Sequence, residues 1–213
     1  IGGGTITEEL TLPGLLHDTF SSGHPWLLSH PMIAHDELGL ISNHGLRYVG
    51  HDPLVTLPFA DGEQITVWRD AERTAREVER FSRKDAKAWL NMLALWKRLA
   101  PTHLARVKRS PSEFQAETST EEAEYRHLLS RSALDVTCEM FESEHVRSLA
   151  LWFAAVTVQP IDRVGTGLLP ISVPAGWAAY GWMNAVGGAS ALVNALAKVV
   201  SEQRGEVRTG VRV

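Results

Sequence analysis

Residues 1–31 read IGGGTITEELTLPGLLHDTFSSGHPWLLSHP, and this stretch decides how the rest of the chain is interpreted. It opens on Gly2, Gly3 and Gly4 and ends in a segment rich in Ser, His and Pro. Glycine loses more conformational entropy on folding than any other residue, so a run of three does not serve stability. Such a run is useful where the backbone must approach a phosphate or a flat ring closely. The plain alternative is a flexible terminal loop.

The order of the short motifs resembles one protein family. The glycine run is followed by Thr-Glu-Glu (7–9), Leu-Pro-Gly (12–14), Asp18 and Ser-Ser-Gly-His-Pro (21–25). This order is similar to the second cofactor motif of the phytoene-dehydrogenase-related FAD-dependent oxidoreductases, within the amine-oxidase-like flavoprotein group. The resemblance covers nearly the whole chain, and its further parts are Asp61-Gly62, Arg69-Asp70-x-x-Arg73-Thr74, Phe141-Glu142-Ser143-Glu144, Gly187-Gly188-Ala189-Ser190 and residues 206–213.

The resemblance implies a cofactor, FAD, and residues that contact it. In the family, the glycine run approaches the pyrophosphate and ribitol, the Ser-Ser-x-His-Pro segment passes near the flavin ring, and the last strand meets the adenine. The residues that take these roles are Gly2, Gly3, Gly4, Thr5, Ser21, Ser22, His24 and Val213. Val186 replaces the family's Arg, and Ala189-Ser190 replace its Met-Gly, which leaves Gly187 and Gly188 a packing role. No residue is identified as catalytic.

The patterns predict an α+β, mostly helical fold. β-like runs at 46–49, 54–59 and 64–69 come first, and Asp61-Gly62 is a hairpin signal. Helical runs follow at 71–81, 82–101, 121–142, 143–158 and 190–204. Asp70 is expected to cap the first run, Pro101 to end the second, and Gly205 to end the last. Residues 102–120 are expected to be a mobile connection, and 207–213 a strand. Combined with the resemblance, these runs imply a partial flavin-domain segment (1–45), a substrate domain with a small antiparallel sheet and several helices (46–170), and a return segment to the flavin domain (171–213).

Composition limits the classes of partner and compartment. The 213 residues are 44% hydrophobic and 22% charged, and the net charge of -4 argues against nucleic acid as a partner. The single Cys138 excludes an internal disulfide and lies in a helical pattern that predicts a buried, inert thiol. The longest apolar run, 149–158, is too short to span a bilayer, and no signal peptide is recognised, so a cytoplasmic protein is expected. Ile1 and Val213 both indicate a piece of a larger protein.

Other catalytic classes have weaker support. Three His-Asp pairs, at 17–18, 35–36 and 51–52, raise the alternative of an HD-type metal phosphohydrolase, but they lie among Gly, Pro and Ser, where packed helices are not expected. The sequence has no G-x-S-x-G elbow, no P-loop and no G-x-G-x-x-G, so the first dinucleotide fingerprint of a flavoprotein is absent from this chain.

The expected parent is an FAD-dependent oxidoreductase acting on an apolar small molecule, of which a polyene or carotenoid is the family's best-known type. The uncharged run 164–197 fits such a substrate. The alternative is a non-catalytic helical module that binds lipid or protein. The isolated chain is expected to be inactive and not to hold FAD, and its apolar terminal strand is expected to favour a homodimer. Peripheral contact with a membrane is a further expectation.

Overall fold

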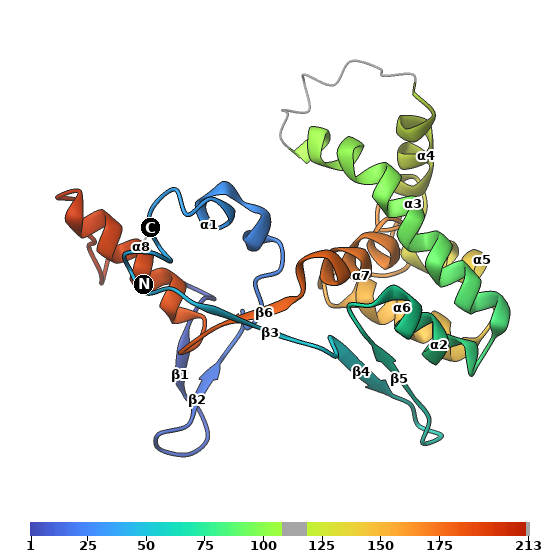
Figure 1. Ribbon diagram of the computed structural model, residues 1–213, viewed down its shortest axis with the longest axis horizontal. Helices are drawn as coiled ribbons and strands as arrows, with labels where there is room; N and C mark the ends of the chain where they lie inside the picture. Colours follow the sequence, from blue (N-terminus) through green and yellow to red (C-terminus); the bar gives the residue numbers. More distant parts are fainter. Residues whose placement is uncertain (108–118, 212–213) are drawn as a thin grey trace. The chain divides into compact units, whose positions relative to one another are not determined.

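The computed structural model describes residues 1–107 and 119–211, and the fold within these ranges is mostly helical. About 48% of the described residues are helical, and the strands form small two-stranded antiparallel sheets (Figure 1). The predicted α+β, mostly helical class is therefore confirmed. None of the helices in the described ranges is long and apolar enough to cross a membrane.

The chain divides into two compact units. Unit 1 combines residues 1–51 with residues 180–213, and unit 2 is the continuous segment 52–179. The sequence-based division placed the boundaries at 45/46 and 170/171, whereas the structure places them after His51 and before Tyr180. The later boundaries follow from β3, Tyr48–His51, which pairs within unit 1, and from α7, Leu169–Tyr180, which lies almost wholly in unit 2.

The described residues of unit 1 form two antiparallel strand pairs, two short helical segments and one longer helix. β1 (Thr7–Glu9) pairs with β2 (Leu16–Asp18), and β3 pairs with β6 (Trp182–Ala185). Between the pairs lie η1 (Leu27–Ser29) and α1 (Pro31–Ala34), and α8 (Ser190–Glu202) ends the unit's regular structure. The apolar core consists of Ile33, Leu40, Leu46, Ala185, Leu192 and Ala195.

The end of α8 differs from its sequence-based description. The left-handed residue is Arg204, with φ of 59°, and the Gly205 amide donates to the Val200 carbonyl at 2.8 Å. Gly205 therefore follows the left-handed position instead of occupying it. The predicted strand 207–213 is not formed over 207–211, where Val207 and Val211 are exposed, and residues 212–213 lie outside the described ranges. A strand needs a partner for its amides, and none of the described strands pairs with residues 207–211.

Unit 2 begins with a hairpin and a capped helix, both as predicted. β4 (Val55–Pro58) and β5 (Gln64–Val67) pair antiparallel, and Gly62 in the turn has φ of 88°. The Asp70 carboxylate accepts from the Arg73 amide at 2.8 Å and starts α2 (Ala71–Glu79). The Ser82 hydroxyl accepts from the Asp85 amide at the start of α3 (Arg83–Val107).

The rest of unit 2 is helical. It contains α4 (Thr120–Leu129), α5 (Ala133–Met140), α6 (Glu144–Ala155) and α7. Its core includes fully buried side chains of α3 and α6, among them Trp89, Leu99, Leu149 and Phe153, and also Phe141 at the end of α5. Phe153 also meets Trp177 of α7 at a ring-centroid distance of 5.2 Å.

Two helix boundaries in unit 2 were predicted wrongly. Pro101 does not end α3, because the turn beyond it is held by contacts to α4, such as His103 Nδ1 with the Tyr125 hydroxyl at 3.0 Å. The expected helix 121–142 is two helices. The break at 130–132 is stabilised by Ser132, which caps α5, and by the Thr166 hydroxyl, which accepts from the Ala133 amide at 2.9 Å.

A buried carboxylate joins α3 to α6. Asp85 is fully buried, and its oxygens accept from the backbone amides of Glu142 at 2.9 Å and Ser143 at 2.8 Å. Ser143 itself makes no side-chain capping bond, so Asp85 satisfies the amides at the start of α6 from another helix.

Candidate functional site

The glycine run forms a tight turn beside the Ser-His segment. Gly2 and Gly3 have φ of 98° and 55°, and the Thr5 amide closes the turn on the Gly2 carbonyl at 2.9 Å. The Ser21 amide donates to the Gly4 carbonyl at 3.2 Å. The structure therefore brings together, in unit 1, the two segments whose residues the sequence singled out.

The three glycines differ in what surrounds them. A Cβ on Gly2 would lie 2.8 Å from a methyl group of Val193 in α8, so this glycine permits close packing. A Cβ on Gly3 would meet nothing within 4 Å, and one on Gly4 would meet only the Cβ of Phe20 at 3.8 Å. Gly2 thus has a packing role, whereas the backbone at Gly3 and Gly4 is open to a ligand.

The polar residues of the predicted set lie near this turn. Thr5, Ser21 and Ser22 are half-buried. The Ser22 carbonyl accepts from the Asn184 side-chain amide at 2.7 Å, which ties the segment to β6. Val213 lies outside the described residues.

His24 is the most constrained member of the set. It is 8% exposed, its Nδ1 lies 3.0 Å from the Tyr48 hydroxyl, and its Nε2 is buried without a hydrogen-bond partner among the described residues. Burial lowers the pKa of His24, against a smaller opposing effect of Asp18, so the imidazole is neutral at pH 7. Burial raises the pKa of Tyr48 to about 12. The pair is therefore uncharged.

Sequence reasoning missed a polar cluster that fixes the β1–β2 hairpin on the N-terminus of α8. Asp18 accepts from the Thr7 hydroxyl at 2.6 Å and from the Ala189 amide at 2.7 Å. Thr7 and Ser190 exchange two hydrogen bonds, from the Thr7 amide at 2.8 Å and from the Ser190 amide at 3.0 Å. Ala189, at the N-cap of α8, has no side-chain oxygen to accept from the first amides of the helix. This residue type was the signal in the sequence that another segment supplies the cap.

The packing role expected for Gly188 has a structural basis here. Its φ is 91°, and a Cβ at this position would lie 2.4 Å from the Thr7 side chain. Gly187, by contrast, has a φ of 88° and open space around its missing Cβ.

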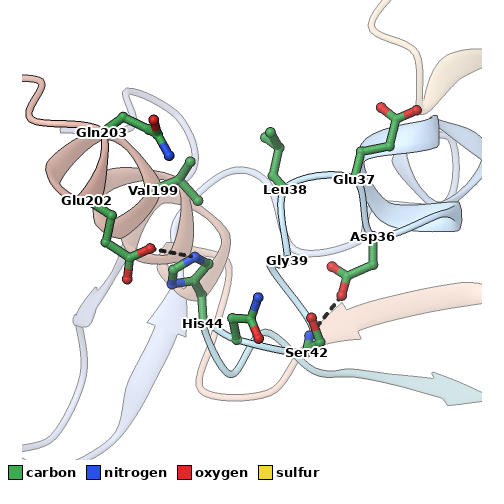
Figure 2. A pocket seen from close by; sticks show the side chains of 10 residues that line it. Asp36, Glu37, Leu38, Gly39, Ser42, His44, Val199, Glu202 and Gln203 are labelled. Carbon is green, nitrogen blue, oxygen red and sulfur yellow. Dashed lines mark hydrogen bonds and ion pairs between the residues drawn. The ribbon is translucent and has the colours of Figure 1, made fainter.

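A surface pocket of about 480 Å³ lies between the last turn of α8 and the segment 36–44 of the same unit. Figure 2 shows the Glu202 carboxylate directed at His44, at 3.5 Å, and Asp36 directed at Ser42. Asp36 accepts from the amides of Ile41 and Ser42, and these bonds lower the pKa of its carboxyl group. Asp36 and Glu202 are thus engaged with protein partners.

The His-Asp pairs do not assemble into a metal site. Within residues 1–107 and 119–211, no group of three or more His, Cys, Asp or Glu is arranged to hold a metal ion. Each aspartate instead binds backbone amides: Asp18 at α8, Asp36 in the 36–42 turn, and Asp52 at the Arg69 amide, 3.1 Å away.

Unit 2 has a smaller pocket of about 340 Å³ beside a His-Asp pair. His145 Nε2 lies 2.7 Å from Asp61 Oδ2, and the ring packs against Phe59 and Phe81, each at 4.6 Å between centroids. The hydrogen bond from the Glu63 amide has the largest effect in lowering the pKa of Asp61, and the bond to His145 adds to it.

Cys138, predicted to be buried, is exposed, because α5 turns Ala133, Val136 and Thr137 toward the core.

The sequence matches no model of a protein family and no curated protein.

Proposed function

We propose that this chain is part of an FAD-dependent oxidoreductase of the phytoene-dehydrogenase-related kind. The observation that carries the proposal is the hydrogen bond from the Ser21 amide to the Gly4 carbonyl, which aligns the two segments that the resemblance assigns to the cofactor. The same unit holds residues 180–213, the segment that the resemblance returns to the flavin domain.

The residues present fit such a cofactor. The open backbone at Gly3 and Gly4 suits the close approach of a pyrophosphate or ribitol. The unpartnered His24 Nε2 offers a polar contact to a ring that carries oxygen and nitrogen atoms. When bound, FAD supplies the redox chemistry, and the protein supplies position and electrostatics.

The proposed substrate is an apolar small molecule of the polyene or carotenoid type. Support comes from α7, which has no charged residue and whose Trp177 packs with Trp152 and Phe153 in an aromatic group of unit 2. The enzyme is proposed to act in the cytoplasm, which fractionation of cells that express the full-length protein would test.

A flavin absorption band in the full-length protein tests the proposal. A folded full-length protein that is colourless would favour the second candidate, a non-catalytic helical module that binds lipid or protein. That candidate is favoured by one observation, the exposure of Leu10, Leu12, Leu15 and Leu16 around the β1–β2 turn. Zinc or manganese that co-purified in stoichiometric amount would instead revive the phosphohydrolase alternative.

The isolated chain is expected not to hold FAD. In dinucleotide folds the first glycine loop and the helix behind it bind the pyrophosphate, and this sequence lacks that fingerprint. Titration with FAD, followed by flavin fluorescence, should show no saturable quenching. Saturation at low micromolar FAD would show that the glycines present suffice.

A further inference from the structure

The turn between β4 and β5 and the first turns of α6 meet at the pocket of about 340 Å³ in unit 2. The hydrogen bond between Asp61 Oδ2 and His145 Nε2, at 2.7 Å, joins the two elements. The lining side chains come from both of them and are Phe59, Ala60, Asp61, Glu144, His145 and Ser148. No Lys or Arg is among them, so the pocket presents acceptor groups beside an aromatic ring.

Asp61 determines which nitrogen of the His145 ring carries the proton. The bond from the Glu63 amide, and then the bond to His145, lower the pKa of the Asp61 carboxyl, so this group is ionised at pH 7. A carboxylate only accepts, and His145 therefore donates from Nε2. Phe59 and Phe81 hold the ring, each at 4.6 Å between centroids. When the ring is neutral, Nδ1 is consequently an acceptor of fixed orientation.

The pocket has further acceptor capacity on its two carboxylates. Asp61 accepts one bond on each oxygen, from the Glu63 amide at 3.1 Å and from His145, and a carboxylate offers about four acceptor positions. Neither Glu144 nor His145 Nδ1 has a hydrogen-bond partner in the part of the chain that the structure describes. A ligand that matches these groups carries positive charge and several N–H donors.

A contact in the same hairpin indicates which cation fits. Glu63 accepts from the Arg80 guanidinium at 2.7 Å, and this guanidinium lies over the Phe81 ring, 5.4 Å from its centroid. A carboxylate and a phenyl ring thus bind a guanidinium together. Asp61 and Phe59 present the same two groups to the pocket. A guanidinium is planar, has five N–H donors and stacks on aromatic rings, so it can contact the carboxylates, the imidazole and Phe59 at once.

We propose that the pocket between the β4–β5 turn and α6 is a binding site for a guanidinium group, carried by a small molecule or by an arginine of another chain. Asp61 and Glu144 are its charge partners, and His145 Nδ1 is a third acceptor. The site lies within unit 2 and uses none of the residues assigned to FAD, so its test does not depend on the proposed function.

The ligand class is tested by NMR titration of the folded chain at pH 8 with methylguanidinium. The ring nitrogens of His145 and the amide of Ser148 should shift and saturate. Methylammonium should bind more weakly, because it cannot reach several acceptors in one plane, and acetate should not bind. Equal binding of methylguanidinium and methylammonium, or shifts without saturation, would overturn the proposal.

The charge partners are tested with matched variants. Asp61→Asn keeps an acceptor for His145 but removes the charge. Since the Asp61 side chain is 53% exposed, its effect is that of a solvent-screened pair, and binding should weaken about fivefold. Glu144→Gln should also weaken it. Glu63→Gln is the control, because it removes a carboxylate that binds Arg80 and does not line the pocket. An equal loss in Glu63→Gln would show a general effect of charge and overturn the assignment.

The source of the guanidinium is tested with the capped tripeptide acetyl-Gly-Arg-Gly-amide. Tighter binding of the tripeptide than of methylguanidinium would support an arginine of a partner chain, and equal binding would support a small molecule. Failure of both probes to bind the folded wild-type chain would overturn the inference, whereas the flavin band of the full-length protein decides the proposed function separately.

Discussion

At the scale of single residues, unit 1 depends on backbone positions that only glycine can occupy. Gly188 brings the β1–β2 hairpin onto α8, and a methyl group there would collide with Thr7.

We expect Gly188→Ala to destabilise the protein by roughly 3 kcal/mol or more, through left-handed strain and the clash together. Gly187→Ala is the matched control, because Gly187 has a similar φ but open space, and strain alone should cost about 1–2 kcal/mol. Urea unfolding monitored by circular dichroism measures both. Equal losses in the two variants would contradict the packing role of Gly188.

Asp85 is the second critical residue. Asp85→Ala removes the acceptor of two buried amides at the start of α6, so we expect a loss of about 2–4 kcal/mol in the free energy of unfolding. The exposed Glu79→Ala, which removes only an ion pair with Arg83 at the protein surface, should change stability by less than about 0.5 kcal/mol. Stability of Asp85→Ala close to that of the wild type would mean that water reaches these amides.

At the scale of elements, two adjacent residues at the end of α8 differ in whether a side chain is tolerated: Arg204 has a backbone conformation that favours glycine, and Gly205 has no room for a Cβ. Arg204 is left-handed without being glycine, so Arg204→Gly should raise the melting temperature by relieving about 1 kcal/mol of strain. Gly205→Ala should lower it, since a Cβ there would lie 2.7 Å from Val200. Thermal melts of the two variants should move in opposite directions. A fall in both would show that Arg204 stabilises the folded state by its side chain.

An element could be predicted from the sequence where the contacts that stabilise it join residues close together in the chain. The Asp61-Gly62 turn and the caps at Asp70 and Ser82 were predictable, because each depends on residues within a few positions of one another. The continuation of α3 past Pro101 was not, because it depends on α4.

The candidate site likewise has residues that the sequence predicts and contacts that it does not. Gly2 to Gly4 and His24 stand out by residue type. The partnership of His24 with Tyr48 and of Asp18 with α8 joins residues distant in sequence, and no local pattern contains it.

At the scale of the whole molecule, each unit contains an imidazole that is at least partly buried: His24 is buried and His103 is half-buried. Burial lowers the pKa of His24 in unit 1 and of His103 in unit 2 below 6.5, so the unfolded chain binds more protons than the folded one below that pH. Their stabilising effect is complete above pH 6.5 and is lost as the pH falls through the folded pKa values.

We therefore expect stability to fall in two stages on acidification. The first begins just below pH 6.5. The second begins when carboxyl groups with lowered pKa, such as Asp61 and Asp135, take up protons below pH 3.8. Hydrogen exchange read separately for each unit measures both stages. His103→Gln, which keeps a partner for Tyr125, should reduce the first stage in unit 2 only, whereas the exposed His35→Gln serves as control. An unchanged first stage would rule out His103 as its source.

The route of the chain between the units has a consequence for evolution and engineering. His51 and Trp182 are opposite partners at the end of the β3–β6 ladder, so the segment between them is inserted at the tip of what would otherwise be a simple hairpin. Opposite residues of an antiparallel pair can be joined by a two-residue turn. Excision of residues 52–181 in favour of Asn-Gly should therefore preserve the register of the remaining ladder. A different domain could be inserted between His51 and Trp182, so unit 2 can be exchanged while the β3–β6 hairpin stays unchanged.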